Sequence, residues 1–153
     1  MDTRANDRID RRTAERGWPD YVVLTLGVVY LAIGALGFTV TDGVGFADNN
    51  GDELLGIFEV NPLHNIVHLA IGLALVAAYM AGRRAVVTIA GIIAATYLLV
   101  GVVGPFLSGE ANILALNGPD HVLHIGTGLV LAATAFAGTR DTRTSRTGTL
   151  RND

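Results

Sequence analysis

Four long apolar stretches constrain this chain more than any other feature of its sequence. They cover residues 21–40, 63–81, 85–107 and 121–137, and none contains an Asp, Glu or Arg. A helix needs about 20 residues to cross the hydrocarbon core of a bilayer, and one charge at its centre costs about 2.5–3.5 kcal/mol. Helices of a soluble bundle would need polar faces, whereas these segments are apolar all round. The sequence therefore predicts an all-α, polytopic membrane four-helix bundle, whose first span is retained rather than cleaved as a signal peptide.

The arginines lie on one side of these stretches, which predicts the orientation. Every basic residue is an arginine: five precede the first stretch, Arg83 and Arg84 separate the second from the third, and four follow the fourth. Because cytoplasmic loops are enriched in positive charge, we expect a multi-pass plasma-membrane protein with both termini in the cytoplasm. We expect the polar tails, residues 1–18 and 139–153, to be disordered. Residues 19–138 then form the transmembrane domain.

Two residue patterns occur twice in the same order, which suggests an internal duplication. Tyr-x3-Gly-x2-Gly begins at Tyr30 and again at Tyr97, and Asn-x6-His-x3-Gly begins at Asn61 and again at Asn117. The copies are offset by 67 residues in the first pattern and by 56 in the second. The difference is the extra length of the loop after the first stretch. We therefore expect two tandem-duplicated helical hairpins, related by an axis along the membrane normal.

Polar side chains recur along one face of the second stretch and one face of the fourth. When successive residues are placed 100° apart around a helix axis, the Asn and His side chains of each stretch lie close to one direction. His64 is the exception and lies about 60° from that direction. Lipid cannot hydrogen-bond an imidazole or an amide, so these faces should point into the bundle. Tyrosines near mid-span of the other two stretches also need buried partners. The predicted intramembrane polar cluster consists of Asn61, His64, Asn65, His68, Asn117, His121, His124, Tyr30 and Tyr97.

The histidines allow three interpretations, which the sequence leaves open. In the first, they hydrogen-bond across helices, to asparagine side chains or backbone carbonyls, and lock the hairpins together. In the second, His68 and His124, which occupy equivalent repeat positions, are cofactor ligands for a metal ion or a haem iron. In the third, they form a proton or solute path with the two tyrosines. His64 aligns with Asp120 rather than with a second histidine, which weakens a symmetric ligand set.

The loop of residues 42–53 is acidic and offers the oxygen ligands that calcium prefers. It lacks the twelve-residue EF-hand spacing, so a solvated acidic turn is the favoured interpretation. The chain contains no cysteine, which excludes disulfides and thiolate metal sites. Nucleotide-binding glycine loops, HExxH, a nucleophile elbow and nucleic-acid modules are also missing. We therefore expect no nucleic-acid partner, and a non-enzymatic role rather than an enzyme.

The block Asn61-Pro-Leu-His-Asn-Ile-Val-His68 and its counterpart Asn117-Gly-Pro-Asp-His-Val-Leu-His124 carry a family resemblance. With them, residues 19–137 resemble a bacterial membrane family called domain of unknown function 4383. The resemblance implies a small four-span membrane protein, and it brings no substrate, cofactor or catalytic residue.

The expected function is that of a structural or accessory membrane component. The lipid bilayer is its first partner, and a homo-oligomer or another membrane protein is a further one. The alternatives are a haem- or metal-binding redox protein that uses His68 and His124, and a small transporter or channel subunit.

Overall fold

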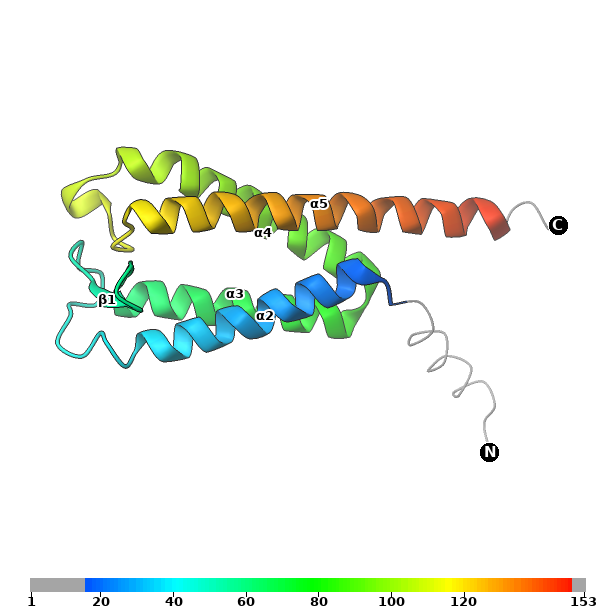
Figure 1. The fold of residues 1–153 in the computed structure, drawn as a ribbon. Coiled ribbons are helices and arrows are strands. Elements are labelled where there is room, and N and C mark those ends of the chain that lie inside the picture. Colours follow the sequence, from blue (N-terminus) through cyan, green and yellow to red (C-terminus); the bar gives the residue numbers. More distant parts are fainter. Residues whose placement is uncertain (1–15, 150–153) are drawn as a thin grey trace, which may run out of the picture.

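Four long helices make up most of the computed structural model, which describes residues 16–149, with side chains to residue 140 (Figure 1). Two short strands and two 3-10 turns lie in the loops that join them. The elements are α2 (Trp18–Gly37), β1 (Asp52–Leu54), β2 (Phe58–Val60), α3 (Pro62–Ala81), α4 (Arg83–Val103), η1 (Gly104–Phe106), η2 (Gly109–Ala111) and α5 (Gly118–Thr149).

All four long helices are long and apolar enough to cross a membrane. The segments that meet this criterion are Trp18–Gly37, Pro62–Ala81, Arg83–Phe106 and Gly118–Arg140. Large apolar side chains such as Leu73, Met80 and Val122 are exposed on their lateral surface. Such exposure is costly in water and is what a lipid-facing surface requires. The predicted all-α four-helix membrane bundle is therefore confirmed, and the chain is a multi-pass membrane protein.

Local signals set where the helices begin and end. Asn61 caps α3 as predicted, and its side-chain oxygen accepts a hydrogen bond from the His64 backbone N–H at 2.8 Å. α4 ends earlier than expected, at Val103, because Pro105 lacks an N–H and the chain tightens into η1. α5 continues past the predicted span to Thr149, where we expected a disordered tail, since no proline interrupts its propagation. The predicted disorder of residues 1–15 and 150–153 lies outside the described residues.

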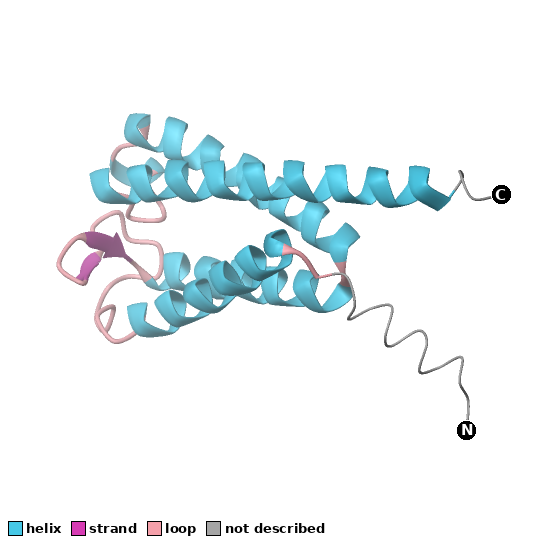
Figure 2. Ribbon diagram, turned by 45° about the vertical axis from the view of Figure 1, so that its right-hand side comes forward, coloured by secondary structure: helices cyan, strands magenta, loops and turns pink. Residues whose placement is uncertain are grey.

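The bundle consists of two hairpins, α2 with α3 and α4 with α5 (Figure 2). Glycines allow the helices of the first hairpin to approach closely. A Cβ at Gly34 would lie 2.9 Å from the Leu69 backbone nitrogen, and one at Gly72 would lie 2.8 Å from that of Leu31. These backbones therefore meet where a larger residue does not fit.

The second hairpin repeats these contacts at equivalent positions. A Cβ at Gly101 would lie 3.1 Å from the Ile125 backbone nitrogen, and one at Gly128 would lie 3.1 Å from that of Leu98. These four positions are the repeat partners of the first set, at the same offsets of 67 and 56 residues. The tandem duplication remains a prediction, and the matched contacts support it.

Two asparagines exchange hydrogen bonds between the hairpins. The Asn61 side-chain amide donates to the Ile113 carbonyl, and the Asn117 side-chain amide donates to the Ile57 carbonyl, both at 2.8 Å. Ile57 and Ile113 occupy equivalent positions in the two copies of the repeat. Each hairpin therefore donates to the other the same kind of hydrogen bond that it accepts.

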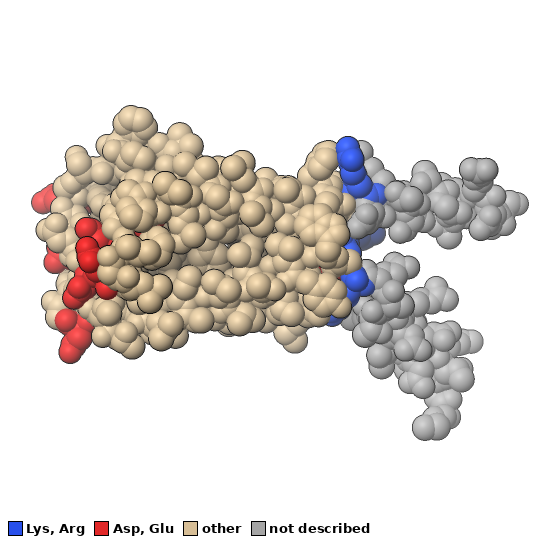
Figure 3. Space-filling view, viewed as in Figure 1, with Lys and Arg blue, Asp and Glu red and all other residues tan. Residues whose placement is uncertain are grey.

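Charge separates the two ends of the bundle (Figure 3). We call the end with the α2–α3 and α4–α5 loops the acidic end, and the end with the α3–α4 turn the basic end. At the basic end, Arg83 forms a salt bridge with the buried Asp20, with 2.7 Å between Nη2 and Oδ2. That ion pair ties the start of α2 to the start of α4.

Candidate metal centre

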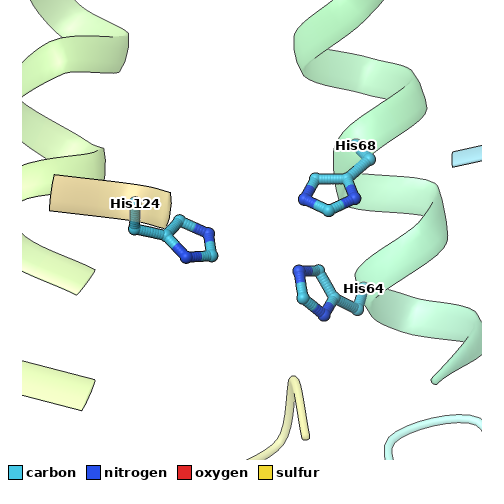
Figure 4. A group of neighbouring side chains, drawn as sticks. All are labelled: His64, His68 and His124. Atoms are coloured by element: carbon cyan, nitrogen blue, oxygen red, sulfur yellow. The ribbon is translucent and has the colours of Figure 1, made fainter. Parts of the chain in front are cut away.

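Three histidines meet inside the bundle near its acidic end. His64 and His68 lie one turn apart near the start of α3, and His124 lies near the start of α5. They are 1%, 4% and 5% exposed, respectively. Figure 4 shows their rings pointing toward one shared space between the two helices. The site therefore joins the two hairpins and is closed to bulk solvent.

The separation of the ring nitrogens suits a small ion. One nitrogen from each ring lies within 4.8 Å of the others. In a tetrahedral site with metal–nitrogen bonds of about 2.0–2.1 Å, the ligand nitrogens lie about 3.4 Å apart. Small side-chain rotations would bring the three rings to that spacing. The ring centroids are 4.3 Å apart for His64 and His68, and 6.1 Å for His64 and His124.

Hydrogen bonding leaves lone pairs available for a ligand. The Nδ1 atom of His124 lies 2.6 Å from the Asp120 carbonyl oxygen, which only accepts, so Nδ1 carries the proton. Its Nε2 atom then has a free lone pair, the state that binds metals. Among the described residues, the Nδ1 of His68 has no hydrogen-bond partner. The His64 nitrogens form no hydrogen bond of good geometry, although the backbone of Glu59 and Leu114 interacts with the ring. Orphaned buried polar atoms are uncommon and indicate a missing partner, such as an ion.

Two tyrosines border the histidines. Tyr30 packs against His68 with ring centroids 5.2 Å apart, and Tyr97 packs against His124 at 4.8 Å. The two tyrosine rings meet edge to face at 5.5 Å. The Tyr30 hydroxyl donates to Thr127 at 3.2 Å and also interacts with the Tyr97 hydroxyl, which forms no hydrogen bond of good geometry within the described part of the chain. The two rings thus form an aromatic wall beside the histidines.

The structure brings together the two histidines expected from sequence as candidate ligands and adds a third histidine. The rings of His68 and His124 are 6.5 Å apart, and His64 lies beside both. On a helical wheel, His64 falls about 60° from the polar face of its helix. Its i, i+4 spacing to His68 nevertheless indicates that the two side chains lie on neighbouring turns of the same face. His121 lies elsewhere, against Gly104 in η1.

The asparagines of the predicted cluster act in structural roles. Asn61 and Asn117 cap helices and bridge the hairpins, and the Asn65 amide donates to the Thr41 hydroxyl at 3.2 Å. Within residues 16–140, no histidine ring bonds to an asparagine side chain, whereas backbone groups of Glu59 and, on the other hairpin, Leu114 interact with the His64 ring. A cross-helix lock through backbone carbonyls therefore stays a prediction.

Part of the acidic loop is a short β-strand, and calcium binding by this loop is not tested by the structure. Asp52 and Glu53 lie in β1, whose antiparallel pairing with β2 runs from Asp52–Val60 to Leu54–Phe58. In the part of the chain that the structure describes, the three histidines are the one group of three potential ligands at metal-binding separation.

Comparison with known proteins gives a family and nothing more specific. The family model described as Domain of unknown function (DUF4383) matches residues 20–137. No curated protein and no solved structure matches the chain.

Proposed function

The chain belongs to the DUF4383 family, and on that premise we propose that it is an accessory membrane protein that binds one transition-metal ion through His64, His68 and His124. The observation that carries the proposal is the convergence of three buried imidazoles, from two hairpins, on one point. Burying polar groups without partners is unfavourable, and a bound ion would supply a partner to the buried nitrogens of His64 and His68.

The ligand chemistry favours zinc or copper. Neutral imidazole suits zinc, copper, iron and nickel, whereas calcium and magnesium prefer oxygen ligands. A bis-histidine haem needs its two ligands on opposite faces of an open slot. His64 lies only 4.3 Å from the His68 ring, beside the space that such a slot would occupy. Three rings around one point favour a single small ion over a haem.

We further propose that the basic end faces the cytoplasm of a plasma membrane, which places the metal centre in the outer leaflet. Arg83, Arg84 and Arg140 lie at that end, and the described loops of the acidic end contain no basic residue. The positive-inside rule supports this orientation. Alkaline phosphatase fused after Asp153 should stay inactive, and green fluorescent protein at the same position should fluoresce. The reverse pattern would overturn the orientation.

Metal binding can be tested on the full chain in lipid nanodiscs. Elemental analysis and titration with zinc or copper should give one ion per chain. The triple variant His64→Ala, His68→Ala, His124→Ala should bind none. His121→Ala is the matched control, because His121 lies outside the cluster, and it should bind like the wild type.

Two results would count against the proposal. If the triple variant binds as much metal as the wild type, the ion lies elsewhere. If the purified protein shows a Soret band that is lost in His68→Ala, the cofactor is a haem.

A further inference from the structure

Asp120 occupies on α5 the position that His64 occupies on α3. Each is the third residue of its helix, and each donates its backbone N–H to the capping asparagine, at 2.8 Å for His64 and 3.2 Å for Asp120. Each is followed four residues later by a histidine of the cluster. The repeat thus places His-x3-His on one hairpin opposite Asp-x3-His on the other.

The carboxylate of Asp120 is buried without a counter-charge. Asp120 is 2% exposed, and its carboxylate accepts a hydrogen bond from the Asn117 backbone N–H at 3.1 Å and a second one from the Glu59 backbone. Within residues 16–140 it forms no salt bridge, and the charge that acts on it is the like charge of Glu59. A carboxylate buried in a membrane span is costly unless a cation compensates it.

A metal ion at the histidines would supply that compensation. Three neutral imidazoles leave the full charge of a divalent ion uncompensated in a low-dielectric interior, and a carboxylate reduces it by one. Three histidines also leave a tetrahedral ion one ligand short. Asp120 already contributes to this centre through its backbone, because its carbonyl orients the ring of His124.

From this pseudo-symmetric placement we propose that Asp120 is the fourth ligand, so that each hairpin contributes two ligands to a three-histidine, one-aspartate site. The inference rests on the proposed metal-binding function. Its carboxylate lies outside the group of three nitrogens, so binding includes rotation of the side chain away from the Asn117 N–H toward the ion. The alternative is that Asp120 only caps α5.

Cobalt(II) is the probe that separates the two roles, since its visible absorption reports the ligand set. The full-length wild type, Asp120→Asn and Asp120→His are titrated with cobalt(II) in nanodiscs. An Asn side chain at position 120 can still accept the hydrogen bond from the Asn117 N–H through its carbonyl oxygen, but it is a poor metal ligand. Asp120→Asn should bind cobalt(II) at least about tenfold more weakly, and its visible spectrum should shift. The spectrum identifies a lost ligand, because changes outside the ligand shell can also weaken binding about tenfold. Asp120→His should restore the affinity with a four-nitrogen spectrum.

Glu110→Gln is the matched control, because Glu110 is an exposed acid in the α4–α5 loop, and it should leave both readouts unchanged. Wild-type affinity and an unchanged spectrum in Asp120→Asn would overturn the inference while leaving the three-histidine site standing. If Asp120→Asn does not fold, Asp120→His decides the question alone. A cobalt(II) spectrum of Asp120→His identical to that of the wild type excludes the carboxylate as a ligand. A wild type that binds no cobalt overturns the proposed function as well.

Discussion

The imidazole of His64 is buried, and among the described residues neither of its nitrogens forms a hydrogen bond of good geometry, although the backbone of Glu59 and Leu114 interacts with the ring. Each such atom costs about 1–3 kcal/mol in the metal-free protein. His124 differs, because its Nδ1 atom bonds to the Asp120 carbonyl. The metal-free chain therefore carries a local instability at His64 that a bound ion would relieve.

We predict that His64→Leu raises the stability of the metal-free protein, because an apolar side chain of similar size removes the unsatisfied nitrogens. The expected gain is about 1–3 kcal/mol, measured by unfolding in detergent with a chelator present. His124→Leu should instead lower it, since the Asp120 carbonyl then loses its partner. At a metal concentration of 100 times Kd, the wild type should gain about 2.7 kcal/mol and His64→Leu nothing. A destabilised, metal-responsive His64→Leu would contradict this account.

Residue patterns in the sequence found the polar cluster but not its geometry. The helical periodicity that places Asn61, Asn65 and His68 on one face describes a single helix, whereas the site forms between α3 and α5. Where α5 lies depends on the packing of the hairpins, which no local pattern encodes. His64 therefore became recognisable as a third ligand only when its distance to His124 was known.

At the scale of elements, the close pairing of α2 with α3 depends on glycine. We predict that Gly34→Ala costs about 1–3 kcal/mol, because its new Cβ would lie 2.8 Å from the Asn65 carbonyl oxygen, a backbone atom that cannot rotate away. Gly126→Ala is the control: Gly126 also lies in a helix, and nothing lies within 4 Å of its would-be Cβ. It should stabilise by about 0.5–1 kcal/mol. Thermal unfolding in one detergent compares the two, and equal effects would refute the packing role.

The helices themselves were predictable because hydropathy and caps are local. The start of α3 followed from Asn61 and Pro62, and the end of α4 follows from Pro105. The β1–β2 hairpin was missed, since its strands are only three residues long. Its turn carries Leu55 at φ 58° and Gly56 at φ 71°, and only glycine signals such a conformation in a sequence.

At the scale of the whole molecule, the metal centre would hold the acidic ends of the two hairpins together. We predict that zinc narrows the distance distribution between spin labels at Phe46→Cys and Phe106→Cys, one on each hairpin. Both positions are exposed, and the chain has no native cysteine. Double electron–electron resonance in nanodiscs measures the distribution. The same labels in the triple histidine variant should not respond. A wild type that binds zinc with an unchanged distribution would show that the ion does not tie the hairpins together.

The exchanged bonds of Asn61 and Asn117 have a consequence for the origin of the chain. An interface in which both partners use the same residues to donate and accept equivalent hydrogen bonds is self-complementary, as in a two-fold symmetric dimer. One hairpin encoded by a shorter gene could thus have assembled with a second copy of itself before fusion joined them. Such a fusion would free the two copies to diverge, and His64 opposite Asp120 is a difference that two identical chains cannot have.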